Sequence, residues 1–157
     1  MPVSTMCFFF GTELMIADTL RLFNVPSPVR ISSMPRGAQI RPCLYSLVED
    51  VCAVDGGGGQ EFRERLNARY EASHVFRAML RRLGVFWSVG AQAIATLTTV
   101  LVFTLEEDPA YIVGWTLPFI WAGIWATVTF WYVFRMLEIE KRVWAEEVAA
   151  KGEVGAA

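Results

Sequence analysis

Two long stretches of the chain contain no charged side chain, residues 83–105 and residues 110–134. As helices that rise about 1.5 Å per residue, they reach roughly 34 and 37 Å, enough to cross a hydrocarbon core about 30 Å thick. Only residues 106–109 separate them, and so short a connection leaves antiparallel neighbours as the arrangement. The pattern therefore predicts an all-α membrane protein built on a two-helix transmembrane hairpin within residues 83–135.

The chain before the first span has the pattern of amphipathic helices. Apolar positions recur at helical spacing in residues 44–54, and a second such pattern starts at Gln60. Four successive glycines, residues 56–59, lie between the two patterns and give the backbone its greatest freedom. We therefore expect amphipathic cytoplasmic helices within residues 43–82, joined by a glycine hinge, with Ser73 capping the helix that enters the membrane.

The two ends of the chain are expected to be less regular. Prolines at positions 26, 28, 35 and 42 interrupt the first segment, which predicts a poorly ordered lead-in over residues 1–42. After residue 134, apolar positions continue at helical spacing among charged ones. This pattern predicts a further cytoplasmic helix within residues 136–157, with a tail that frays from Gly152.

Basic residues near the span ends predict the orientation. Six arginines precede the first span and three basic residues follow the second, whereas the connecting segment has none: Arg63, Arg65, Arg69, Arg77, Arg81, Arg82, Arg135, Lys141 and Arg142. Because basic residues stay on the cytoplasmic side of a membrane, both termini are expected there, or on the equivalent side of an organelle. The acidic connection would then lie opposite.

Small and aromatic residues indicate where helices make contact inside lipid. Acyl chains are as apolar as leucine, so the two spans are expected to meet through close backbone approach and polar contacts, with small residues marking the seam between them. The first span carries small residues at intervals of three and four, and the second carries two deep tryptophans whose indole N–H groups need an acceptor. These two tryptophans are expected to face protein, or a lipid or ligand carbonyl, and not bare acyl chains. The candidate packing or partner contacts are Gly84, Ser88, Ala91, Gln92, Ala95, Trp121 and Trp125.

Composition argues against several classes of function. The net charge of −2 disfavours nucleic acid as a partner, because binding phosphates requires a clear excess of Lys and Arg. His74 is the only histidine, and the three cysteines lack metal-ligand spacing. We therefore expect no catalytic residue, no cofactor and no bound metal, and a protein that is not an enzyme.

Two functions remain open. In the first, the protein is an accessory, scaffold or interaction subunit of a membrane assembly, in contact with lipid and with other subunits or further copies of itself. In the second, it is a homo-oligomeric cation channel in which Glu106, Glu107 and Asp108 form an acidic ring at the pore mouth. The absence of ionisable residues from both spans disfavours a self-contained pump or transporter.

Several strings resemble an uncharacterised fungal family of proteins with two membrane spans. They are RPCLYSLVEDV at residues 41–51, Val54 and Asp55 before the four glycines, RYEAS at residues 69–73, and Gly114-Trp115 with FIWAG at residues 119–123. The resemblance covers residues 36 to about 142. It implies a fungal membrane protein without an assigned activity. Residues 1–33 fall outside it and are compatible with an extended start upstream of Met34.

Overall fold

The computed structural model describes residues 2–154, and side chains within residues 3–149. This part of the chain is helical and contains no β-strand beyond two isolated bridges. The elements are α1 (Pro2–Leu22), α2 (Cys43–Asp50), the π-helix η1 (Val51–Asp55), α3 (Gly59–Ala72), α4 (His74–Thr104) and α5 (Glu107–Val154). The all-helical class is therefore as the sequence predicts.

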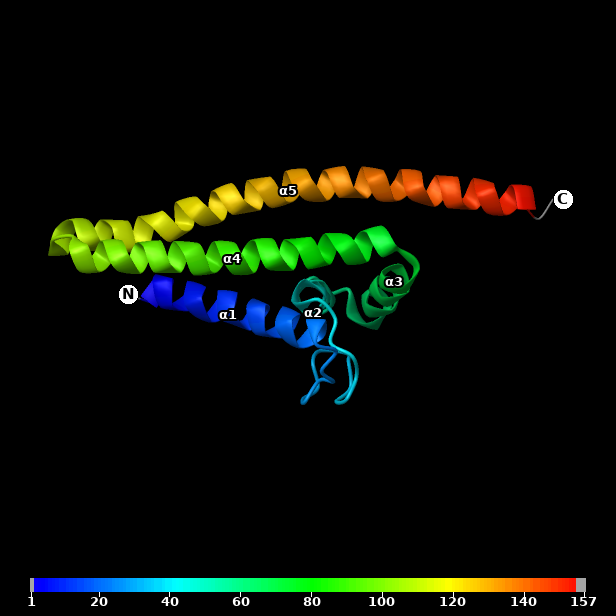
Figure 1. The fold of residues 1–157 in the computed structure, drawn as a ribbon, viewed down its shortest axis with the longest axis horizontal. Helices are drawn as coiled ribbons and strands as arrows, with labels where there is room; N and C mark the ends of the chain where they lie inside the picture. The colour runs from blue at the N-terminus through cyan, green and yellow to red at the C-terminus, as the bar shows by residue number, and fades with distance from the viewer. Residues whose placement is uncertain (1, 155–157) are drawn as a thin grey trace.

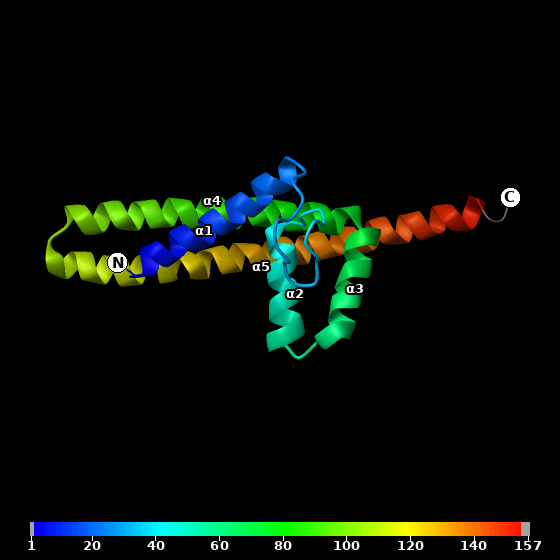
Figure 2. The ribbon, with the colours of Figure 1, turned by 90° about the horizontal axis from the view of Figure 1, so that it is seen from below.

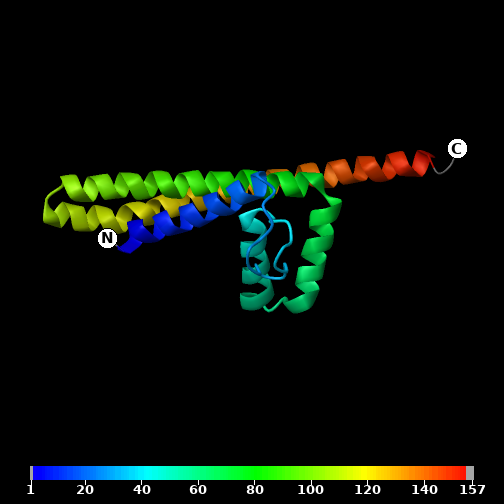
Figure 3. The ribbon, with the colours of Figure 1, turned by 60° about the horizontal axis from the view of Figure 1, so that its bottom comes forward.

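Three long helices lie side by side along one axis, with α4 between α1 and α5 (Figure 1). The turn between α4 and α5 is at one end of this bundle, which we call the acidic end. At the other end, α2 and α3 project from the bundle as a pair, and α5 continues past them (Figures 2 and 3). We call this the basic end, because Arg77, Arg81, Arg82 and Arg135 are there.

Helix α1 is the main departure from the sequence-based expectation. Instead of a poorly ordered lead-in, residues 2–22 form a helix that packs along α4. Only residues 23–42 are irregular, and even these are held by backbone hydrogen bonds such as Ser27 N to Ala38 O at 2.9 Å. The amino end of α1 lies near the α4–α5 turn (Figure 1). The termini of the described chain are therefore at opposite ends of the bundle.

By length and composition, three helices are apolar enough to cross a membrane, not two. They are Val3–Leu22, His74–Thr104 and Glu107–Ala149. The third runs without interruption through Pro118 and beyond the predicted span to Val154. The expected fraying from Gly152 is not seen as far as Val154, and residues 155–157 lie outside the described residues.

Helix α4 begins at the position that the sequence predicts. Ser73 has an extended backbone, with φ −103° and ψ 112°, and its Oγ accepts a hydrogen bond from the Phe76 N–H at 3.1 Å. A serine at this position satisfies one of the N–H groups that the first helical turn leaves unpaired. The cap lets α4 change direction from α3 at a single residue.

The four-glycine segment forms a tight turn that brings α3 back alongside η1. Gly57 has φ +67°, a conformation that residues with a side chain rarely adopt. A Cβ atom on Gly58 would lie 2.7 Å from the Phe62 Cβ and 3.0 Å from the Cys52 carbonyl oxygen. The glycines are therefore required by close backbone packing as well as by the turn itself.

A hydrophobic core joins the basic end of the bundle to α2 and α3. Its buried members come from α2, α3, α4 and α5: Leu44, Tyr45, Leu66, Val75, Phe76, Met79, Leu80, Leu83 and Met136. Beside it, Arg69 of α3 donates to Glu140 of α5 through Nε at 3.3 Å and through Nη2. Burial raises the pKa of Glu140, but hydrogen bonds from Arg69 and Ser73 lower it to below its ordinary value. The pair is thus intact at neutral pH and is lost as pH falls through that lowered pKa.

Candidate functional site

The small residues of the predicted seam, Gly84, Ser88 and Ala91 of α4, contact α1, not α5. Ser88 Oγ donates to the Gly11 carbonyl oxygen at 3.0 Å, and Gln92 Nε2 donates to Thr12 Oγ1 at 2.7 Å. A Cβ atom on Gly11 would lie 3.1 Å from the Ala91 Cβ. The predicted seam was assigned to the two spans of the hairpin, and this assignment is wrong, because a third helix that the sequence analysis did not expect covers that face.

The same face continues to the basic end. A Cβ atom on Gly84 would lie 2.6 Å from Asp18 Oδ2, so the missing side chain makes room for an α1 carboxylate. Arg21 Nε donates to the other oxygen of Asp18 at 3.3 Å. Ala95, toward the acidic end, is almost completely buried. Close backbone approach and a few polar contacts thus hold α1 on α4.

Aromatic side chains join α4 to α5. The rings of Phe86 and Trp125 stack with centroids 4.6 Å apart, and those of Trp87 and Trp121 meet edge to face at 5.8 Å. Trp125 Nε1 donates to the Phe86 carbonyl oxygen at 3.2 Å, and Trp87 Nε1 donates to Thr129 Oγ1 at 3.1 Å. Trp121 and Trp125 therefore face protein, which is where the sequence analysis expects them.

Gly90 makes this arrangement possible, and the sequence analysis did not single it out. A Cβ atom there would lie 2.5 Å from Trp125 ring atoms. Because Gly90 has no side chain, the indole of Trp125 reaches the carbonyl oxygen of Phe86, four residues earlier in α4. That oxygen has a second lone pair available for the indole N–H. The one signal in the sequence is a glycine in the middle of a long helix, where it is unfavourable unless close packing requires it.

We predict that Gly90→Val separates α4 from α5 locally. The added methyl groups overlap the indole of Trp125, and overpacking of this kind costs about 1–3 kcal/mol. Purified in detergent, the variant is expected to lose about 5 °C in the midpoint of thermal unfolding. Its tryptophan emission is expected to shift to longer wavelength as Trp125 leaves Phe86.

The matched control is Gly123→Val on α5. A Cβ atom at Gly123 has no neighbour within 4 Å, so the same substitution in the same kind of element adds no overlap. Its midpoint should stay within about 1 °C of the parent value. Equal losses in the two variants would show that valine in a helix, and not the Trp125 contact, causes the effect.

The three acidic residues of the turn are exposed and form no ion pair within residues 2–154. Glu107 and Asp108 belong to the first turn of α5, where a negative charge interacts favourably with the helix dipole. Glu106 precedes that helix. Their placement thus has a structural reason that does not require an ion pathway. Within the described residues, no group of His, Cys, Asp and Glu is arranged to hold a metal ion.

A polar cavity of about 790 Å³ lies at the basic end, between α1, the 23–42 segment and α3. Four arginines line it, and each is already engaged. Arg77 Nη1 donates to the Tyr70 carbonyl oxygen at 2.8 Å, and Arg41 lies 4.6 Å from the centroid of the Tyr45 ring. The remaining two, Arg21 and Arg63, pair with carboxylates. These arginines therefore serve to hold the irregular 23–42 segment against α3.

The three cysteines are free thiols. Cys43, at the start of α2, has a pKa raised to about 11, chiefly by burial and further by the charges of Asp18 and Glu13. A thiol with so high a pKa stays protonated at neutral pH, and the thiolate is the reactive form. Cys43 is thus a packing residue and has none of the features of a nucleophile.

The comparisons with known proteins give one match. A family model described as a domain of unknown function, DUF8766, matches residues 1–144. The chain belongs to the DUF8766 family. The DUF8766 match includes residues 1–33, so the expectation that these residues stand apart from the rest is corrected, and it covers α1 together with the bundle. No curated protein and no solved structure matches the chain.

Proposed function

We propose that the protein is an integral membrane protein with three spans, α1, α4 and α5, and that it acts as an accessory or interaction subunit of a membrane assembly. The observation that carries the proposal is the outer surface of the bundle. Large apolar side chains are exposed on all three helices: Phe9, Ile16, Val89, Val100, Phe103, Ile112, Phe119, Ile120, Ile124 and Phe130. Water-soluble monomers rarely expose contiguous apolar surface on this scale.

The distribution of charge supports one orientation for all three helices. Arg21 lies in the last turn of α1 and Arg30, Arg36 and Arg41 follow it, whereas residues 2–20 contain no basic residue, so the positive-inside rule assigns the carboxyl end of α1 to the cytoplasmic side. The arginines of α3 and of the first turns of α4, together with the basic residues of α5 after residue 134, assign the same side to the basic end of the bundle. Because α1 runs antiparallel to α4, the amino terminus is then on the side of the acidic turn, which revises the expectation that both termini are cytoplasmic.

A binding role follows from the surfaces that the bundle leaves free at its basic end. Helix α5 continues past α2 and α3 (Figure 2), and Trp144 and Val148, which follow the Arg69–Glu140 contact along α5, are exposed. Exposed aromatic and aliphatic side chains on a helix are typical anchors for a partner helix. We therefore propose that this part of α5 binds another subunit in the cytoplasm or on the equivalent side of an organelle.

The test is extraction of membranes from cells that produce the full chain with a small tag. We expect the protein to stay in the pellet after washing with alkaline carbonate, because spans are not released by that treatment. After mild detergent, we expect it in a complex heavier than one chain, and Trp144→Ala should reduce that mass. Release into the carbonate wash would refute the spans, and a bare monomer in detergent would refute the subunit role.

A further inference from the structure

A narrow groove lies between α4 and α5 at the level where their charge-free stretches end. Its volume is about 270 Å³, and its lining is almost entirely apolar. The lining residues are Arg82, Leu83, Phe86, Val128, Thr129, Trp131 and Tyr132. Sites for drug-sized ligands are usually larger, roughly 300–1,000 Å³. The groove therefore has the size for a length of one hydrocarbon chain and not for a bulky cofactor.

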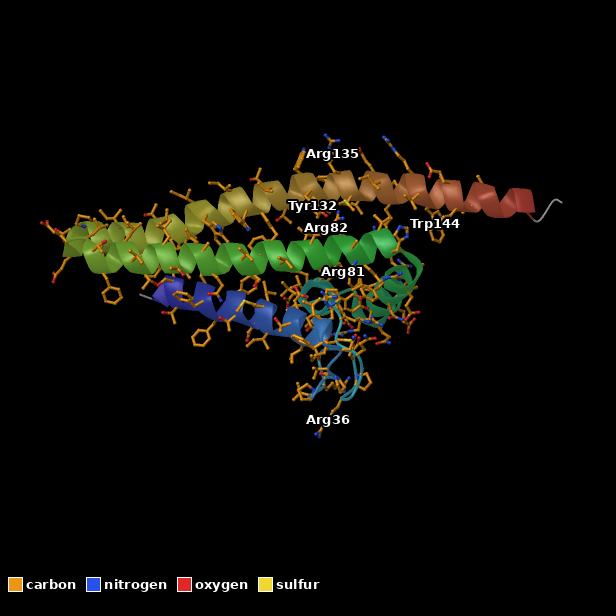
Figure 4. The ribbon with its side chains drawn as sticks, in the orientation of Figure 1. Arg36, Arg81, Arg82, Tyr132, Arg135 and Trp144 are labelled. Carbon is orange, nitrogen blue, oxygen red and sulfur yellow. The ribbon has the colours of Figure 1, made fainter. Side chains whose placement is uncertain are left out.

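One arginine, Arg82, lines the groove. Arg81, Arg82 and Arg135 lie at the same level along the bundle (Figure 4). Within the described residues, Arg81 and Arg82 form no ion pair and no hydrogen bond, and Arg135 lies only against the ring of Trp131 at 5.5 Å. The arginines of the polar cavity, by contrast, are all engaged.

A second polar group at this level lacks a partner. Tyr132 and Arg82 both lie in the space between α4 and α5 (Figure 4), and the Tyr132 hydroxyl is buried with no hydrogen-bond partner. A buried hydroxyl without a hydrogen-bond partner carries an uncompensated desolvation cost. An occupant that brings an oxygen acceptor to this depth removes that cost.

We propose that the groove binds an anionic phospholipid, with one acyl chain along Val128 and Phe86 and the phosphate at Arg82. This inference rests on the proposed membrane location. In that location the groove opens to the leaflet on the basic side, which is the leaflet rich in anionic lipids in a plasma membrane. The ester oxygens below the phosphate are the acceptors that the Tyr132 hydroxyl lacks.

Charge and shape together favour this occupant over others. A soluble phosphorylated molecule satisfies Arg82 but leaves the apolar walls without a partner. A neutral phospholipid fills the walls but brings no net charge to Arg82. Basic pockets between membrane helices on the cytoplasmic side are a recurrent form of site for anionic head groups. The anionic phospholipid is the occupant that matches both parts of the groove.

The experiment uses the full chain in nanodiscs made of equal parts phosphatidylglycerol and phosphatidylcholine with identical acyl chains. After gentle release, native mass spectrometry counts the lipids that stay on the protein. We expect phosphatidylglycerol to be retained about tenfold over phosphatidylcholine, the ratio for one charge-assisted contact. Arg82→Gln should reduce this preference to about twofold.

Two further variants separate the groove from the surface charge around it. Arg81→Gln removes an adjacent arginine that does not line the groove, so it should keep the tenfold preference. Val128→Trp fills the groove without changing any charge, and it should lower retention of both lipids. Because it leaves the arginines intact, it tests the acyl-chain part independently of Arg82→Gln.

Equal retention of the two lipids by the parent protein, or equal effects of Arg81→Gln and Arg82→Gln, would overturn the inference. A particle of two chains with no retained lipid would overturn it too, with a second copy as the occupant. Failure of the parent protein to enter nanodiscs would instead refute the proposed membrane location. A chain that enters nanodiscs without lipid preference refutes only the lipid site.

Discussion

Tags at the two ends of the chain are expected on opposite faces of the membrane. In the proposed topology the α4–α5 hairpin returns to its starting face, and α1, packed on α4, adds a third crossing. The contacts that fix α1 there are specific: Ser88 and Gln92 donate to α1 oxygens, and Asp18 occupies the space beside Gly84. A hairpin with a cytoplasmic lead-in would place both tags on one face.

The measurement is protease protection of sealed vesicles, with one tag before Met1, one after Ala157 and a third inserted between Gly57 and Gly58. The third tag is in the turn before α3, at the basic end. It should share its face with the carboxyl-terminal tag in every vesicle preparation. The amino-terminal tag should show the opposite protection, an all-or-none difference. If all three tags share one face, α1 does not cross the membrane and the two-span prediction from the sequence stands.

The pattern of charge predicted the two long helices well but missed the third. Residues 83–105 and 110–134 are recognisable because nothing charged interrupts them. In α1, Glu13 and Asp18 interrupt the apolar run, so this helix lacks the charge-free stretch that marks the other two. The structure accounts for Asp18 by long-range contacts, namely the missing side chain of Gly84 and the guanidinium of Arg21. A single sequence does not contain that pairing, because the two positions are distant along the chain.

The same limit applies to the helix seams. Spacing correctly grouped Gly84, Ser88 and Ala91 on one face of α4, because helical periodicity is a local property. It did not say which helix covers that face, which is a tertiary property, and the choice of α5 was wrong. The need of a buried indole for an acceptor is local chemistry, and it correctly predicted that Trp125 faces protein. The acceptor itself, a carbonyl exposed beside Gly90, required the structure.

The proposed lipid groove is a further example. Arg81 and Arg82 are neighbours in the sequence and equivalent in composition, charge and helical context. Only the direction of their side chains from α4 separates the one that lines the groove from the one that does not. Sequence analysis used both arginines to orient the chain, and that inference needed only the number of basic residues on each side of the spans. Predicting a binding site also requires the direction in which each side chain leaves the helix.

Arg63→Met is expected to destabilise the α2–α3 unit by about 3 kcal/mol, the lower part of the range for breaking a buried ion pair. Arg63 Nη1 lies 2.7 Å from Oε1 of Glu49, whose side chain is 0% exposed. Arg63 also donates to Ser32 Oγ at 2.8 Å and so holds the 23–42 segment. Its removal leaves a carboxylate in the protein interior with no cation beside it.

Hydrogen exchange measured by mass spectrometry on the detergent-solubilised chain detects this loss locally. Amides of α2 and α3 should exchange about 100-fold faster in Arg63→Met than in the parent, whereas those of α4 beyond residue 83 should not change. Arg65→Met is the matched control, because Arg65 pairs with Glu61 on the exposed surface of the same helix. Exposed pairs contribute little, so exchange there should stay within about twofold.

The double variant Glu49→Gln with Arg63→Met identifies the cause. If the penalty comes from an unpaired buried charge, then removing the charge restores most of the protection, because a neutral amide is far less costly to bury than a carboxylate. If it comes instead from the lost contact with Ser32 and the freed 23–42 segment, the double variant exchanges as fast as Arg63→Met alone. Recovery to within about tenfold of the parent rate is the expected result, and it would show that Arg63 is retained chiefly to neutralise Glu49.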